Sequence, residues 1–428
     1  MREELTLQST GKVGKAFGGI ALTQCDLFGA IKLKCRPTTH RHRKPTMSSR
    51  WSGAAGTPSY ICAGETSLYP PPFGLCLDIQ PMSPPWKPRF VLATPSALGW
   101  AEGVAMVERA AGLGAEVVRL RSDRLAGLPE AYRDAKRTLA VVTASPSRRR
   151  LQPIPPSADW RFDLAEGCPA HCTYCYLAGS LAGPPIVRAY ANLPEILAEL
   201  QTAVGHGAVT SASAARAHEG TTFECSCYTD PLALEHLTGH LATCITTFGA
   251  WDAAVQLRFT TKFDAVEPLL ALPHNRRTRV RFSVNAREAE RHEGGAPRMP
   301  RRLAALRAMA LAGYPVGLTV APILRFEGWA ASYDRLFADV AVSLDGVPDL
   351  DLTAELITHR FTPKSKGVLA GWYPGSPLEM DEAARSRKTT KFGSVKYVFP
   401  REDMVAMRTA IEGSIARWIP QTKVLYWT

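Results

Sequence analysis

The sequence predicts an α/β protein built on a parallel sheet that is either open or closed into a barrel. Two features of the chain lead to this class. From about Pro88 onward, apolar runs of strand length alternate with longer stretches of helical periodicity, and repeated strand-then-helix units form parallel sheets. Most polar and glycine-containing motifs also follow directly after a predicted strand, at the end where barrel enzymes hold their chemistry.

The folded part is expected to begin with a small α/β domain at 82–146. Strands are predicted at 90–93, 116–120 and 139–143, with helices at 99–113 and 128–135. The basic, proline-rich stretch 147–156 is expected to be a linker. Residues 1–81 show little periodicity and mix a basic cluster with Ser, Gly and Pro, so we expect a disordered or spurious leader without a catalytic role.

The main domain is expected at 157–345, where strands and helices alternate in order. Strands are predicted at 161–164, 221–225, 257–261, 279–284 and 316–321, and helices at 193–204, 232–248, 265–270, 301–312 and 329–342. A further strand at 351–357 closes the series. Repeated units of this kind place the polar residues after each strand at one common edge of the sheet.

The carboxy-terminal segment, 346–428, is basic. Its cations include Arg385, Arg387, Lys388, Lys391 and Lys396, and a predicted strand at 395–399 sets aromatic residues among them. This mixture suits phosphate contacts and base stacking, although an exposed basic hairpin without a ligand would show the same pattern. The final helix at 403–418 and strand at 423–426 are expected to be structural.

Composition indicates a globular protein. The chain has 428 residues, of which 46% are hydrophobic and 21% charged, and it contains no apolar run long enough for a transmembrane helix. Its first residues, MREELTLQST, lack the order of a secretory signal. The net charge of +12 favours a polyanionic partner without establishing one. We therefore expect a cytoplasmic protein whose cysteines stay reduced.

Three cysteines form the most distinctive motif of the chain. Cys168, Cys172 and Cys175 have the spacing C-x3-C-x2-C within GCPAHCTYCYL. Three thiolates this close suit three irons of a cubane cluster and leave the fourth iron without a protein ligand. A structural zinc site would need a fourth Cys or His, which His171 could supply, but the spacing fits zinc modules poorly.

The motifs that follow resemble, in order and spacing, those of the spore photoproduct lyase family, DNA-repair enzymes of the radical S-adenosylmethionine (SAM) class. Tyrosines flank the third cysteine, and the later motifs are FECSCYTDP at 223–231, RFTTKF at 258–263, RFSVN at 281–285, GYPVGLTVAPILRFEGW at 313–329, HRFTPKSKGVLAGWYP at 359–374 and KFGSVKYVFP at 391–400. The resemblance runs from about Pro88 to Thr428. It implies a partial (β/α)6 radical SAM barrel that binds a [4Fe-4S] cluster and SAM.

The resemblance also implies roles for individual residues. The three cysteines would hold the cluster. Polar groups of SAM would be held by Lys262, Ser283 and Thr229, with Asn285 nearby and Tyr174 close to the adenine. Thr229 stands where the family has Ser, and it keeps the hydroxyl.

The reaction implied by the resemblance is the repair of 5-thyminyl-5,6-dihydrothymine in UV-damaged DNA to two thymines. A 5′-deoxyadenosyl radical would take hydrogen from C6 of the lesion, after an electron donor such as flavodoxin or ferredoxin has reduced the cluster. Cys227 matches the family's hydrogen-donor cysteine, and Tyr176 and Tyr174 resemble the tyrosines that relay hydrogen back. The basic carboxy-terminal hairpin would then contact DNA.

Two departures from the family pattern leave alternatives open. Cys225 lies two residues before Cys227, so on a continuous strand both thiols would face the same way. The stretch RSRKTTK at 385–391 lacks the aromatic residue expected among the basic side chains that grip the lesion. A radical SAM enzyme of the same lineage with another substrate is therefore an alternative, as is a zinc-containing DNA-binding protein.

Overall fold

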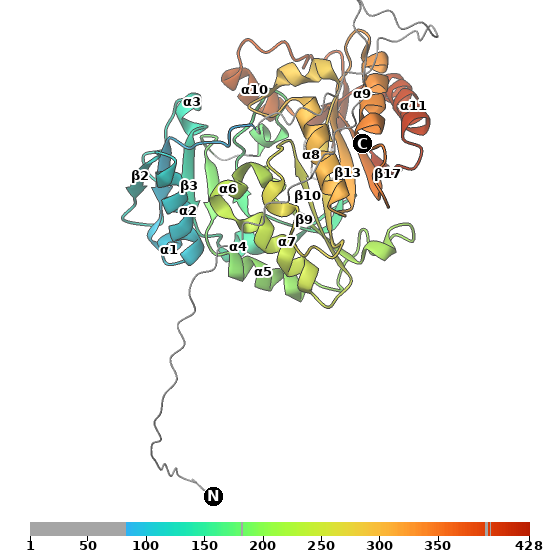
Figure 1. Cartoon of the computed structure of the whole chain (residues 1–428). Coiled ribbons are helices and arrows are strands. Elements are labelled where there is room, and N and C mark those ends of the chain that lie inside the picture. Colours follow the sequence, from blue (N-terminus) through green and yellow to red (C-terminus); the bar gives the residue numbers. More distant parts are fainter. Residues whose placement is uncertain (1–82, 181–182, 390–392, 394) are drawn as a thin grey trace, which may run out of the picture. The chain divides into compact units, whose positions relative to one another are not determined.

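The computed structural model describes residues 83–180, 183–389, 393 and 395–428 (Figure 1). These residues form two larger sheets with helices around them. Within this described part, no helix is both long and apolar enough to cross a membrane. The expectation for residues 1–81 lies outside the described residues.

The first sheet has the strand order β2-β1-β3-β8-β6. Its strands are β1 (Phe90–Ala93), β2 (Glu116–Arg119), β3 (Thr138–Val142), β6 (Ala165–Glu166) and β8 (Val187–Tyr190), and all neighbours run parallel except β6 and β8. The helices of this region are α1 (Pro95–Leu98), α2 (Ala101–Gly112) and α3 (Tyr132–Ala135). The predicted strands at 90–93, 116–120 and 139–143 are all present, whereas β6 and β8 come from beyond the expected domain boundary at residue 146.

The second sheet has eight strands in the order β17-β14-β13-β11-β10-β9-β5-β4. Its members are β4 (Gln152–Ile154), β5 (Ala158–Phe162), β9 (Thr221–Cys225), β10 (Val255–Thr261), β11 (Thr278–Val284), β13 (Val316–Ile323), β14 (Leu352–Thr358) and β17 (Lys423–Trp427). All pairs are parallel except β4–β5. The six strands from β5 to β14 follow chain order, which confirms the predicted partial (β/α)6 barrel.

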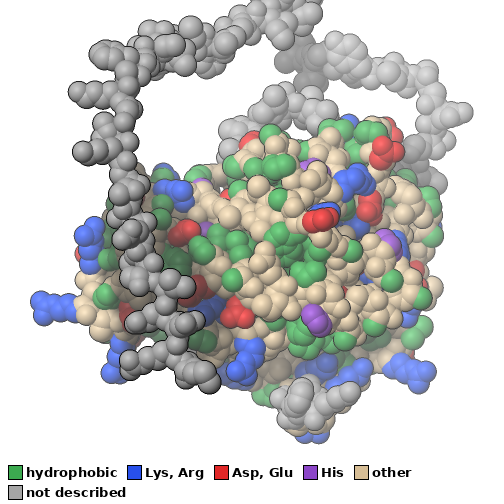
Figure 2. Space-filling model, turned by 90° about the horizontal axis from the view of Figure 1, so that it is seen from below, with side chains coloured by type: hydrophobic (Ala, Val, Ile, Leu, Met, Phe, Trp, Pro, Cys, Tyr) green, Lys and Arg blue, Asp and Glu red, His purple; other side chains and the backbone are tan. Residues whose placement is uncertain are grey.

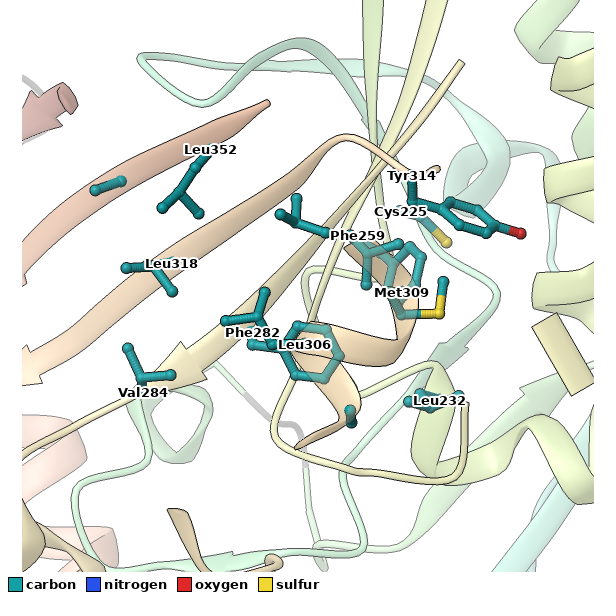
Figure 3. Close-up of a cluster of buried hydrophobic side chains, with 14 of the residues drawn as sticks. Cys225, Leu232, Phe259, Phe282, Val284, Leu306, Met309, Tyr314, Leu318 and Leu352 are labelled. Carbon is teal, nitrogen blue, oxygen red and sulfur yellow. The ribbon is translucent and has the colours of Figure 1, made fainter. Parts of the chain in front are cut away.

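Helices cover the outer face of this sheet (Figure 1). They are α5 (Leu193–Thr202), α7 (His240–Ala250), α8 (Met299–Leu311), α9 (Trp329–Leu344) and α11 (Arg401–Trp418). The short α6 (Glu235–Thr238) packs instead against α2 of the first sheet. The apolar residues of alternate strand positions, such as Phe259 and Phe282, point into this layer and pack against Leu306 and Met309 of α8 (Figure 3). This packing is the main hydrophobic core, and it fixes the direction in which the remaining strand positions point.

The inner face of the sheet is polar because the intervening strand positions are charged. Glu224, Arg258, Arg281 and Glu355 are all buried there. The Arg258 guanidinium lies 3.1 Å from Glu355 although β10 and β14 are separated by two strands, and Arg281 contacts both Glu224 and Glu355. Strands about 4.8 Å apart bring such side chains together only if the sheet curls. A buried ionic layer therefore forms the floor of the half-barrel.

Several elements were not predicted from the sequence. The expected linker at 147–156 contains α4 (Pro146–Arg149) and β4, which pairs with β5. The carboxy-terminal segment adds α10 (Pro363–Trp372) and β15 (Ser386–Thr389). The predicted strand at 395–399 is present as β16 (Val395–Val398), which pairs with β15 in the expected hairpin, and the predicted strand at 423–426 is β17, which joins the barrel sheet beside β14. Two short strands, β7 (His171–Cys172) and β12 (Glu293–Gly294), pair with each other. The second sheet therefore crosses the expected boundary at residue 345.

Candidate active site

The cysteine loop begins directly after β6. Gly167 has a φ of +79°, and a Cβ at this position would lie 2.2 Å from the backbone oxygen of Ile186. Only glycine tolerates both the left-handed backbone and this close approach to β8. The position of Cys168, the first cysteine of the loop, is thus fixed by the packing of Gly167 against the first sheet.

The three cysteine side chains lie in one cluster of buried residues with Tyr174. All three are free thiols; Cys172 is buried, and Cys168 and Cys175 are half-buried. Burial raises the pKa of Cys168 to about 12, and the nearby Lys136 ammonium opposes this effect. Buried thiols that resist ionisation fit a group that itself brings positive charge, as the irons of a cluster do.

Residues of the first domain hold this loop from outside. Lys136, which follows α3, is buried and its ammonium donates hydrogen bonds to the backbone oxygens of Cys168 and Ala170. The Tyr132 hydroxyl lies 3.1 Å from Nδ1 of His171. The side chain that could have closed a zinc site is thus hydrogen-bonded to a tyrosine.

Among the described side chains, no three His, Cys, Asp or Glu residues converge on a point where a single metal ion would bind. A zinc ion would need such convergence. A cubane cluster does not, because each thiolate binds a different iron.

The residues expected to hold SAM lie beside this loop. Lys262 follows β10 and Ser283 lies on β11, and the Lys262 ammonium donates a hydrogen bond of 2.6 Å to the Ser283 hydroxyl. The ammonium also lies 5.5 Å from the centre of the Tyr174 ring. The structure therefore brings together Lys262, Ser283 and Tyr174, which come from three separate motifs.

Thr229 and Asn285 differ in how free their side chains are. The Thr229 hydroxyl is buried and has no hydrogen-bond partner in the described part of the chain, so it is available to a ligand. The Asn285 amide is fully buried, accepts from the Tyr333 hydroxyl at 2.8 Å and donates to the backbone oxygen of Pro322 at 2.9 Å. Asn285 is therefore engaged inside the protein.

The predicted hydrogen donor, Cys227, lies on a tight turn after β9. Ser226 has a φ of +59°, and its backbone N–H donates to Phe162 at 2.7 Å while its hydroxyl accepts from Leu164 at 3.2 Å. The Tyr176 hydroxyl donates to the backbone oxygen of Cys227. The end of β5 and the cysteine loop thus hold this turn from two sides, although its Ser226 backbone is strained.

The electrostatic surroundings keep the Cys227 thiol protonated. Burial raises its pKa well above the usual value, and the carboxylates of Glu224 and Asp163 raise it further. Burial likewise raises the pKa of Asp163 to about 6. A protonated thiol is the form that can give up a hydrogen atom.

The concern that Cys225 would lie beside Cys227 is not supported by the strand geometry. β9 ends at Cys225, and the turn at Ser226 breaks the alternation on which the same-face argument rests. Cys225 is buried in the main core (Figure 3), and Cys244 of α7 is close enough to raise its pKa further. The two cysteines of this motif therefore occupy different environments.

The basic hairpin contains the residues predicted to contact DNA, with one correction. Arg385 is buried, pairs with Glu379, and lies 3.7 Å from the centre of the Phe399 ring. Its guanidinium is thus used inside the protein, because it anchors the base of the hairpin. Arg387 and Lys388 are exposed, and Lys388 lies opposite the half-buried Lys396. Lys391 lies outside the described residues.

Sequence reasoning missed residues whose importance depends on contacts across the fold. Glu293 accepts hydrogen bonds from both Tyr174 and Lys262, and Lys136 holds the cysteine loop. Burial lowers the pKa of Lys396, and the nearby charges of Arg360 and Lys388 lower it further. Arg360 therefore adds positive charge beside the hairpin. Arg360 lies in the motif at 359–374, but Glu293 and Lys136 lie in no recognisable spacing pattern. For Glu293 there is a weak signal, a carboxylate followed by two glycines.

Comparisons with known proteins identify the family of this chain. Residues 86–428 match the family model described as "Spore photoproduct lyase". A spore photoproduct lyase of Geobacillus sp. (strain Y412MC61) is 38% identical over 80% of this chain and 99% of its own length. That of Bacillus subtilis (strain 168) is 35% identical over 81% of this chain and its own full length.

Solved structures give the same result. A spore photoproduct lyase mutant with bound AdoMet (SAM) and dinucleoside spore photoproduct has a TM-score of 0.74 and 37% identity, covering 81% of this chain and all of its own. A complex of spore photoproduct lyase with dinucleoside spore photoproduct has the same values. The match extends across the small amino-terminal sheet, the half-barrel and the basic hairpin. The chain therefore belongs to the spore photoproduct lyase family.

Proposed function

We propose that this chain is a spore photoproduct lyase, which uses SAM and a [4Fe-4S] cluster to convert 5-thyminyl-5,6-dihydrothymine in DNA into two thymines. The observation that carries the proposal is the contact between the cysteine loop and the donor turn, where the Tyr176 hydroxyl reaches the backbone of Cys227. A radical source and a hydrogen donor must lie this close if the first is to create a radical on the lesion and the second is to quench the radical that remains after the bridge breaks.

The residues present fit both cofactors. Three free thiols can bind three irons, and the Thr229 hydroxyl and one remaining N–H of Lys262 are available for a polar ligand. When bound, the cluster and SAM supply a 5′-deoxyadenosyl radical that removes hydrogen from C6 of the lesion. Lys262, Ser283 and Thr229 bind SAM, and Tyr174 packs on its adenine side. Asn285 supports this site from within the protein.

Cys227 returns hydrogen to the lesion. Breaking the methylene bridge leaves a thymine-methylene radical, and a protonated thiol within contact distance quenches it. Tyr176 then gives hydrogen back to Cys227, and Tyr174 continues the relay toward the cofactor. The 68% exposure of Tyr176 supports a position on the open side of the loop, where the lesion would enter.

The basic hairpin binds the phosphates around the lesion. Lys388 and Lys396 lie directly opposite each other on β15 and β16, and like charges in this position destabilise a hairpin unless an anion neutralises them. Arg387 and Arg360 add further charge, while Arg385 supports the hairpin. On the face seen in Figure 2, described Lys and Arg side chains lie mainly around the rim. The DNA contact thus rests on specific residues rather than on overall charge.

The reaction also requires an electron donor, for which flavodoxin or ferredoxin is suitable, and a reducing cytoplasm. The test is anaerobic reconstitution of the full chain with iron and sulfide, followed by incubation with SAM, dithionite and dinucleoside spore photoproduct. We expect about four irons per chain and lesion-dependent formation of thymine dinucleoside. Reaction with another UV lesion but not with spore photoproduct would favour the alternative substrate, and a zinc-loaded, inactive protein would favour the DNA-binding alternative.

A further inference from the structure

Glu293 connects the cysteine loop with the SAM-binding side of the barrel. Its carboxylate is 3% exposed, and Oε1 accepts hydrogen bonds from the Tyr174 hydroxyl and, at 3.0 Å, from the Lys262 ammonium. Its backbone pairs with that of Cys172 through β12 and β7. One residue therefore contacts the loop that carries the cysteines and the lysine that faces the cofactor.

The charge of Glu293 is balanced by two cations. Arg302 of α8 forms an ion pair with Oε2 and also donates to the backbone oxygen of Ser283 at 3.1 Å. The Lys262 ammonium meets one carboxylate oxygen and the Arg302 guanidinium meets the other. These three side chains together carry a net charge of +1, which suits the carboxylate of a bound amino acid.

The hydrogen bonds of Lys262 fix the direction in which its ammonium group points. An ammonium group has three N–H donors, and in Lys262 two of them go to Ser283 and Glu293. The third is left for a ligand, and the ammonium cannot turn without breaking a bond to a buried carboxylate. Without Glu293, the buried Arg302 and the half-buried Lys262 would lose the anion between them, and the lysine would lose its fixed direction.

We propose that Glu293 is a positioning residue for SAM: it orients Lys262 toward the carboxylate of the ligand and ties that arrangement to the cysteine loop. The inference rests on the proposed function, since it concerns the same SAM site. Glu293 does not touch the ligand and acts through Lys262 and Tyr174.

The test compares Glu293→Gln with the wild-type chain, both reconstituted with iron, and measures SAM affinity by equilibrium dialysis. Glu293→Gln should keep the iron content of the wild type but bind SAM at least tenfold more weakly. Its effect should also be smaller in a Lys262→Gln background, because both changes act on one interaction. The matched control is Glu290→Gln, three residues earlier, whose carboxylate accepts hydrogen bonds from the Arg298 side chain and the Met299 backbone among the described residues.

Unchanged SAM affinity of Glu293→Gln, or full additivity with Lys262→Gln, would overturn the inference. If Glu293→Gln does not retain iron, Glu293→Asp is tested instead. Its shorter side chain keeps the negative charge but holds it farther from Lys262. Full iron with weaker SAM binding would then support the role, and wild-type affinity would overturn it. Failure of the wild-type chain to bind SAM would overturn the proposed function as well.

Discussion

The turn of the chain sets the position of Cys227, the proposed hydrogen donor. The strained backbone at Ser226 separates it from Cys225, so one cysteine enters the hydrophobic core and the other meets the carboxylates of the barrel interior. Two cysteines of the same motif therefore lie in different environments. Cys227 combines a protonated thiol with a backbone contact to Tyr176 of the cysteine loop.

Replacing Cys227 with Ala should uncouple lesion cleavage from clean repair. The variant should still consume the dinucleoside lesion, but the thymine-methylene radical would form adducts because no thiol is at hand. In D2O the wild type should place deuterium in the thymine methyl group, since thiol hydrogens exchange with solvent. Mass spectrometry of the products checks both statements.

Cys225→Ala is the matched control for this experiment. It removes a thiol from the same motif but from the core, so it should cost about 1 kcal/mol of stability and leave the product pattern unchanged. Clean thymine formation by Cys227→Ala, or adducts from Cys225→Ala, would show that the donor has been wrongly assigned.

At the scale of elements, the cysteine loop is held by structures that are distant in sequence. Gly167 packs against β8, Lys136 reaches the loop from the end of α3, and β12 pairs with β7. These three contacts, all made by residues distant in sequence, thus fix the cysteine loop. Cluster binding should be sensitive to changes in these contacts.

Gly167→Ala should lower iron incorporation. The new methyl group would meet the Ile186 backbone oxygen at 2.2 Å, so the loop must shift in addition to the cost of about 1 kcal/mol for a left-handed alanine. Gly114→Ala is the control, since its φ is +88° but no atom lies within 4 Å of the new methyl group. Iron per chain after reconstitution measures the effect, and equal iron in both variants would contradict this account of the loop.

The hairpin of β15 and β16 should account for part of the salt dependence of DNA binding. Removing Arg387 and Lys388 together should reduce the slope of log affinity against log salt by up to about 2 on lesion-containing duplex DNA. Arg276→Ala removes a cation from the opposite ends of the strands, before β11, and should leave the slope unchanged. A slope that falls equally in both cases would place the DNA elsewhere.

For the whole molecule, the alternation of strands and helices predicted a parallel sheet, and the family resemblance implied that it forms a partial barrel. β9, β10, β11 and β13 lie where the apolar runs predicted them, within two residues. The shorter strands β6, β7 and β12 were missed because two residues carry no periodicity. The break between α6 and α7 at Gly239 was missed because the apolar pattern continues through it.

The candidate site was predicted only where motifs carry it. Cys168, Cys172, Cys175 and Cys227 stand in recognisable frames, as does Lys262. Glu293 does not, because its role arises from buried contacts with Lys262, Tyr174 and Arg302, which are distant in sequence. For Arg385, the basic pattern suggested an exposed cation, but the ring of Phe399 and the carboxylate of Glu379 bury it. A pattern of charges in the sequence does not by itself distinguish a buried cation from an exposed one.

The central claim is that this fold, with both cofactors, turns one specific lesion into two thymines. The most direct measurement is the amount of thymine dinucleoside formed from dinucleoside spore photoproduct by the anaerobically reconstituted chain, with SAM and dithionite present. Formation of this product that depends on SAM, on iron and on the three cluster cysteines is the predicted result. An iron-loaded protein that cleaves SAM yet leaves the lesion intact would contradict it.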